Sequence, residues 1–234
     1  MSVLAVSHSS ISCYDTCPYQ YRAKYVTKEV KFTQSAEAKW GDDVHNALEA
    51  YGKTGRPLPA NMLHYKPYID AVLARPGEKI FEGSCAIDID GNKCSYWEKD
   101  ATGGNKVWIR AKIDVLNLRH DIRRAEIFDW KTGAKPKDDP EQMMMYAMFV
   151  FLFYPDIDEI RTGFSWLKQP LHLAFTNPRA FYRRQLPELM AYFRRKYDDI
   201  EHAIEVDAFP KKQSGLCNGW CDVKSCEYSK PKKG

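Results

Sequence analysis

The chain has 234 residues, of which 44% are hydrophobic and 28% charged, and its formal net charge is +4. This balance excludes an intrinsically disordered chain and a polycationic nucleic-acid coat. The length suits one large domain, or one domain with a small appendage. No apolar run approaches the roughly 18–20 residues that span a bilayer, and the N-terminus lacks the pattern of a signal peptide. We therefore expect a cytoplasmic protein that does not enter a membrane.

The first third of the chain predicts helices. Residues 9–26 show helical spacing of apolar side chains, and Pro18 should kink or restart that helix. Residues 35–51 predict a second helix, ended by Gly52 and the glycine that follows at position 55. Residues 63–73 predict a further helix, which ends before Pro76-Gly77.

The middle of the chain changes to a strand pattern. Residues 79–88 and 93–98 predict a hairpin around Asp-Gly-Asn, with a further loop at residues 101–105. Residues 106–118 predict a long strand, and a polar link then leads to a strand that ends near Asp129.

The last part of the chain mixes both kinds of element. Residues 143–153 are apolar on nearly every side and predict a buried helix, followed by strands at 161–167 and 171–175 and a long helix at 177–204. Residues 209–234 are irregular and need a staple to fold. This order predicts an α/β sheet with helices on both faces.

The tripeptide Asp129-Trp130-Lys131 stands at a strand end. Asp/Glu-x-Lys occurs four times in the chain, but only this copy lies on a hydrophobic strand pattern. Alternation places Asp129 and Lys131 on one face of the strand, with Phe128 and Trp130 in the core. An acid and a lysine so placed can bind a metal ion and stabilise an attacked phosphate.

Two further residues can complete a metal site with Asp129. Asp114 lies in the long strand, where a buried unpaired acid is costly and a shared divalent cation removes that cost. The alternative is a surface ion pair with Arg110 or Lys112. His45 is the candidate third ligand and would suit Mn²⁺, although a lone helical histidine can equally be a surface or satisfied core residue.

Two side chains of the following helix stand close to Lys131 in this scheme. Gln142 and Tyr146 lie one turn apart and can position a nucleic-acid backbone or the lysine. The alternative is a polar spot on a packed helix.

Taken together, these segments resemble the RecB-type branch of the PD-(D/E)xK nuclease superfamily, and also its AddB-type and CRISPR-adaptation exonucleases with a cysteine-bound cluster. The matching segments, in family order, are SCYDTCPYQYRAKYV, GDDVHNALEAY, RAKIDVL, FDWKTG and EQMMMY. Glu82 occupies the place of an acid usually found in the first strand. The family commonly has a glycine just before the residue that corresponds to Asp114, and this chain has none there.

The resemblance implies a restriction-endonuclease-like fold, with a mixed central sheet flanked by helices over residues 1–208. Residues 209–234 would form a Cys-rich segment that folds back on the N-terminal helix. By the same resemblance, Mg²⁺ or Mn²⁺ would be bound by His45, Asp114, Asp129 and the backbone carbonyl of Trp130. Lys131 would be catalytic together with the two acids, and Gln142 and Tyr146 would form an auxiliary motif.

The seven cysteines form a second pattern. Cys85 and Cys94 lie in strand-like segments and are interpreted as core thiols, whereas the others gather near the chain ends. In cluster-bearing relatives, three C-terminal cysteines join one upstream cysteine to hold a [4Fe–4S] cluster. Here the set would be Cys17, Cys217, Cys221 and Cys226, with Cys13 in reserve. The Cys-x3-Cys-x4-Cys spacing moves the middle cysteine from its usual place. Zinc and metal-free thiols are therefore alternatives.

The sequence thus predicts a metal-dependent DNA exonuclease used in recombination, repair or phage DNA processing. Any helicase or recombination partner would be a separate chain, and no oligomeric state is predicted. One alternative is a catalytically silent module that binds DNA or a partner, but the complete acid and lysine set argues against it. An iron–sulfur electron carrier would leave that set without a role.

Overall fold

The computed structural model describes residues 4–31, 33–134, 136–175 and 179–230. The chain divides into two compact units. The first comprises residues 1–5 and 34–191, and the second comprises residues 6–33 and 192–234. The predicted boundary after residue 208 stays a prediction.

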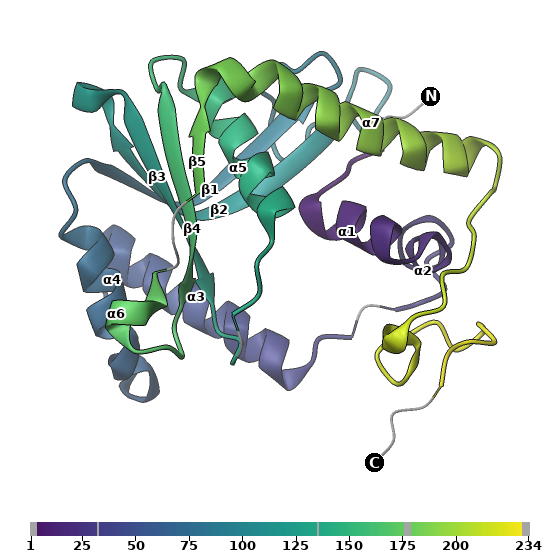
Figure 1. Ribbon diagram of the computed structural model, residues 1–234, viewed down its shortest axis with the longest axis horizontal. Helices are drawn as coiled ribbons and strands as arrows, with labels where there is room; N and C mark the ends of the chain where they lie inside the picture. The colour runs from purple at the N-terminus through teal and green to yellow at the C-terminus, as the bar shows by residue number, and fades with distance from the viewer. Residues whose placement is uncertain (1–3, 32, 135, 176–178, 231–234) are drawn as a thin grey trace. The chain divides into compact units, whose positions relative to one another are not determined.

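A five-stranded mixed sheet forms the centre of the first unit (Figure 1). The strands follow the chain order, and only β3 and β4 run parallel among the four neighbouring pairs. The strands are β1 (Glu78–Asp88), β2 (Val107–Arg119), β3 (Arg124–Lys131), β4 (Glu159–Trp166) and β5 (Arg179–Tyr182). The mixed central sheet flanked by helices confirms the predicted fold class.

One face of the sheet packs against α3 (Ala36–Thr54) and α4 (Lys66–Leu73), which follows a 3₁₀ helix at Ala60–Tyr65. Phe128 and Trp130 of β3 lie in this core, as their place in the alternation predicts. The core also contains Val44, Leu48, Ile69, Val72, Phe81 and Val115. Burying each large apolar side chain stabilises the fold by about 1.5–3 kcal/mol.

The helix α5 (Pro140–Phe153) connects β3 to β4 and packs on the other face of the sheet. It is apolar all round, so it is buried along most of its length as predicted. Asp139 caps its first turn by accepting a hydrogen bond from the Gln142 backbone N–H, and Pro140 occupies the first helical position. This cap fixes the start of α5 and places Gln142 in its first turn.

The helix α3 runs past the predicted end at Gly52. Its true C-terminal cap is Gly55, whose φ of 70° is left-handed. A Cβ at Gly52 would lie 2.3 Å from the Phe81 ring, so the glycine permits close packing of α3 on β1 rather than ending the helix. At the start, the Ser35 side chain accepts a hydrogen bond from the Ala38 N–H.

Three predicted elements differ from the structure. Residues 93–98 form no strand, and β1 pairs with β2 instead. Residues 171–175 contain the short helix α6 (Leu171–Ala174) where a strand was expected. The helix predicted for residues 177–204 is α7 (Leu186–Glu205), preceded by β5; residues 177 and 178 lie outside the described residues.

The second unit contains α1 (His8–Thr16), α2 (Pro18–Tyr21), a π-helical turn at Arg22–Val26 and most of α7. Pro18 restarts the helix, as predicted. Within this unit the C-terminal segment contacts the N-terminal helices, where Lys212 Nζ donates to the Asp15 carbonyl at 2.9 Å. Lys24 and Asp222 form an ion pair at 3.3 Å. None of the helices in the described part of the chain combines the length and apolar character that crossing a membrane requires.

Candidate active site

Three side chains of the first unit converge on one point. They are His45 of α3, Glu82 of β1 and Asp114 of β2, and one ligand atom of each lies within 4.8 Å of the others. His45 Nδ1 is 3.3 Å from Asp114 Oδ1. Among the described residues, this is the group of three whose donor atoms could hold a metal ion. Of these, His45 and Asp114 were predicted as ligands from the sequence.

Asp114 is buried at the place where the β2–β3 ladder ends. The last pair of that ladder is Val115 with Phe128, and the Asp114 carboxylate then accepts a hydrogen bond from the Trp130 backbone N–H at 2.7 Å. A buried backbone donor beyond the ladder needs such a partner. The bond holds one carboxylate oxygen in place and leaves the other directed at His45.

Glu82 reaches the same point through an unusual backbone conformation. Its φ is +50°, in the left-handed region, although it lies inside β1 between the paired residues Phe81 and Gly83. A non-glycine residue in this region costs about 1–2 kcal/mol, and such strain often accompanies a functional site. Sequence reasoning gave Glu82 no ligand role, because an alternating strand pattern contains no signal of this local turn.

The acids of the site make its potential negative. Burial raises the pKa of Glu82, and the charge of Asp114 raises it further. Burial lowers the pKa of His45, but the hydrogen bond and charge of Asp114, aided by Asp129 and Glu82, outweigh that effect and raise it to about 9. A group of acids that attracts a proton so strongly also attracts a cation.

Asp129 is held by a network on the β3–α5 side. Its Oδ1 accepts hydrogen bonds from the Tyr146 hydroxyl at 2.9 Å and from Gln142 Nε2 at 3.0 Å. Gln142 Nε2 also lies 2.7 Å from the Tyr146 hydroxyl. Burial and the nearby charge of Asp114 raise the pKa of Asp129. The structure thus brings Gln142 and Tyr146 to the acid of the tripeptide, and their exact role stays a prediction.

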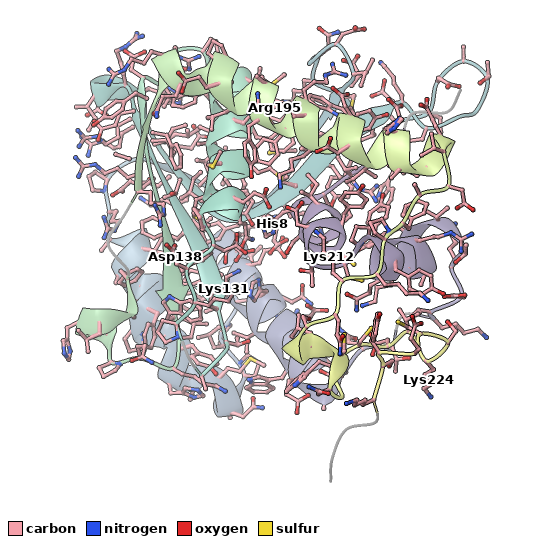
Figure 2. The ribbon with its side chains drawn as sticks, turned by 45° about the vertical axis from the view of Figure 1, so that its right-hand side comes forward. His8, Lys131, Asp138, Arg195, Lys212 and Lys224 are labelled. Carbon is pink, nitrogen blue, oxygen red and sulfur yellow. The ribbon has the colours of Figure 1, made fainter. Side chains whose placement is uncertain are left out.

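Lys131 completes this network at the end of β3, where Figure 2 labels it. Its Nζ lies 2.5 Å from Asp129 Oδ2 and donates to Gln142 Oε1 at 3.2 Å. The ammonium also lies 4.9 Å from the centre of the Phe164 ring. The side chain remains 29% exposed, so the charge is fixed in position and still accessible to a ligand.

The comparison with known families decides the identity of this arrangement. A model described as the PD-(D/E)XK nuclease superfamily matches residues 5–229. The chain belongs to this superfamily. Membership implies a metal-dependent phosphodiesterase that acts on DNA.

Two solved structures align with this nuclease at low sequence identity. A Eubacterium rectale protein described as a candidate exonuclease aligns with a TM-score of 0.50 at 12% identity, over 97% of this chain and 89% of its own. The crystal structure of SSO0001 aligns with a TM-score of 0.46 at 13% identity, over 96% of this chain and 87% of its own. The search of curated proteins found no match.

The donor set of this nuclease fits a divalent cation. Two carboxylates and one imidazole offer oxygen and nitrogen ligands, and the three side chains already lie within reach of one ion. Asp129 lies next to this group, with Oδ1 engaged by two donors and Oδ2 by Lys131. For Trp130 the described contact is that of its backbone N–H, and the ligand role of its carbonyl stays a prediction.

Five of the seven cysteines lie in the second unit, and Cys85 and Cys94 lie in the first. A small cavity of about 20 Å³ is lined by the four cysteines of the predicted set, Cys17, Cys217, Cys221 and Cys226. Cys13 does not line it, and burial raises the pKa of the Cys13 thiol to about 11. Cys85 is buried in β1, as predicted for a core thiol, whereas Cys94 lies half-buried in a loop. Among the described residues, the four cavity cysteines do not form a group as tight as His45, Glu82 and Asp114.

Proposed function

We propose that this chain is a RecB-type DNA exonuclease that uses Mg²⁺ or Mn²⁺ at His45, Glu82, Asp114 and Asp129. The observation that carries the proposal is the convergence of the His45, Glu82 and Asp114 ligand atoms beside the Asp129–Lys131 pair. A role in recombination, repair or phage DNA processing is consistent with this activity, and a separate helicase or recombination protein would supply the unwound substrate. The cytoplasm is the expected location.

The proposed chemical role of each group follows from its contacts. A bound divalent cation would screen the phosphate and lower the pKa of the attacking water. Lys131 donates to the phosphate oxygens, where negative charge grows during attack, because its ammonium is the accessible end of the network. Gln142 and Tyr146 occupy Asp129 Oδ1, which leaves Oδ2 as the oxygen available to a cation when Lys131 turns to the phosphate.

A catalytically silent module of the same fold is the second candidate. It would have no use for a lysine held at hydrogen-bond distance from a buried acid and an amide. The left-handed backbone of Glu82, which directs its carboxylate to His45 and Asp114, also fits a functional contact better than a silent module. Both features therefore favour the enzyme.

The first experiment tests cleavage directly. Linear and covalently closed circular single-stranded DNA are incubated with the protein and Mg²⁺ or Mn²⁺, and products are resolved on gels. We expect degradation of linear DNA from its ends, no cleavage of closed circles, and loss of activity by at least about 100-fold in Asp129→Ala. Wild-type protein that leaves both substrates intact would favour the silent module, and cleavage of closed circles would show an endonuclease.

We further propose that Cys17, Cys217, Cys221 and Cys226 hold a [4Fe–4S] cluster. Support comes from the shared cavity and from the irregular backbone after α7, which has few apolar side chains to hold it. Zinc is the alternative occupant, because four thiolates also satisfy its tetrahedral preference. Such a centre would tie the C-terminal segment to α2 inside the second unit.

The protein purified without oxygen tests the cluster. We expect a brown protein whose iron content falls to background in Cys226→Ser and is unchanged in Cys94→Ser. Cys94 is the matched control, because it is also half-buried but lies outside the cavity. A colourless wild-type protein that contains zinc would show that zinc occupies the site. A protein that contains neither metal would show that the cysteines are free thiols.

A further inference from the structure

The connection between β1 and β2 presents an exposed aromatic side chain. Tyr96 and Trp97 are the central residues of a turn closed by the Glu98 N–H, which donates to the Ser95 carbonyl at 3.0 Å. The Glu98 carboxylate braces the same turn by accepting from the Ser95 N–H at 2.7 Å. Trp97 is nevertheless 69% exposed. Most of a large apolar ring thus faces solvent on a backbone that is well fixed.

Arg110 of β2 holds this ring in place. Its guanidinium lies 3.7 Å from the centre of the Trp97 ring and 5.0 Å from that of the Tyr96 ring. It also donates to the Tyr96 carbonyl at 3.4 Å. A guanidinium stacked on an indole orients the ring and places a positive charge beside it. An aromatic face next to a cation is the combination that binds a nucleic-acid base together with its phosphate.

The strand β2 connects this turn to the active site. Side chains two residues apart share a face, so Arg110, Lys112 and Asp114 lie along one face of β2. Arg110 and Asp114 are four residues apart, which corresponds to about 13 Å along the strand. That distance spans about four nucleotides of a stacked strand. Lys112 lies between them, 57% exposed and 3.9 Å from Glu82.

We propose that Trp97, held by Arg110, is a stacking platform for one base of a single DNA strand whose backbone passes Lys112 toward Asp114. The platform would hold the strand a few nucleotides from the bond that is cut. A base is accessible for stacking only when it is unpaired, so the platform selects single-stranded DNA. The direction of the strand toward Asp114 rests on the proposed nuclease function, whereas the stacking itself does not.

Binding in the absence of metal tests the platform without requiring cleavage. A fluorescent oligothymidylate and an abasic oligonucleotide of equal length are titrated with protein in EDTA, and anisotropy is recorded. Wild-type protein is expected to bind the oligothymidylate about tenfold more tightly, the size of effect that stacking of one base provides. Trp97→Ala is expected to remove that preference, and Trp97→Phe to retain most of it.

Two controls separate stacking from other effects. Trp220→Ala removes a tryptophan of nearly equal exposure, 67%, and is expected to leave the base preference unchanged. Arg110→Lys keeps the positive charge but not the planar stack, so it is expected to bind the abasic chain normally and lose part of the preference. Circular dichroism confirms that each variant is folded.

The outcomes distinguish this proposal from the proposed function. A Trp97→Ala protein that keeps the wild-type base preference, or that loses affinity equally for both oligonucleotides, overturns the platform. A wild-type protein that shows the base preference but never cleaves DNA overturns the nuclease and leaves the platform standing. Cleavage of DNA by a wild-type protein that shows no base preference overturns the platform and leaves the nuclease standing.

Discussion

Lys131→Ala is expected to lower the rate of DNA cleavage by about 100- to 1,000-fold, the effect of removing one well-placed donor from a growing negative charge. The ammonium is held by Asp129 and Gln142 at the end of β3 and is still partly exposed, so it can reach a bound phosphate without moving the backbone. The measurement is the initial rate on labelled linear DNA at saturating metal. Metal binding should be retained, because the lysine is not a ligand.

Lys39→Ala is the matched control for this variant. Lys39 belongs to another Glu-x-Lys tripeptide, on α3, but its Nζ forms an exposed ion pair with Asp43 at 2.8 Å. Exposed pairs of this kind contribute little to stability. Lys39→Ala should therefore cleave DNA as the wild type does. Cleavage at the wild-type rate by Lys131→Ala would contradict the assigned role.

The strand alternation predicted the positions of Asp129 and Lys131 correctly because only one face of β3 at this end enters the hydrophobic core. Residues 106–118 were expected as a strand and form β2, and the side chains of Asp129 and Lys131 meet on the face opposite Phe128 and Trp130. Period two is a reliable signal when one face enters a core. The contact of His45 with Asp114 joins α3 to β2, and His45 was expected as a third ligand although a lone helical histidine could equally be a surface or core residue.

Two errors in the predicted elements arose where strand-like side chains are not buried as a strand face. Leu171 and Leu173 alternate, but they are 40% and 58% exposed on the short helix α6. Tyr96 and Trp97 favour strands by propensity, yet they form a turn that Arg110 stabilises by stacking. In both places the conformation depends on a tertiary contact or on solvent exposure. The periodicity of a single sequence gives no information on either.

Glu82 shows a different limit of sequence reasoning. Its neighbours in β1 pair regularly with β2, so the register alone predicts an ordinary strand residue. The left-handed φ redirects this one side chain to Asp114 and His45. The buried Glu82 carboxylate beside Asp114 raises the free energy of the metal-free fold, and a bound cation reverses that effect. Protonated His45 offsets part of this cost in the metal-free protein, and a bound cation is expected to add further stability.

Asp114→Asn tests this coupling between metal and stability. The amide oxygen of asparagine can still accept the Trp130 N–H, and the substitution removes a charge close to Glu82 and Asp129. It also removes the carboxylate that pairs with protonated His45, so the two effects oppose each other and the metal-free variant should melt close to the wild-type temperature. Mn²⁺ at about 100 times its dissociation constant should raise the wild-type melting temperature by about 5–10 °C. The variant should lose this rise, together with DNA cleavage.

Asp88→Asn separates the metal site from the general effect of altering a buried acid. Asp88 is 7% exposed, close to the 8% of Asp114, but it caps the turn after β1 by accepting the N–H groups of Asp90 and Asn92. Because it lies outside the ligand group, its variant should keep the full Mn²⁺-induced rise in melting temperature. Differential scanning fluorimetry with and without Mn²⁺ provides both values. If Asp114→Asn kept the rise as well, the cation would be bound elsewhere, and the buried acid would serve the backbone of β3 alone.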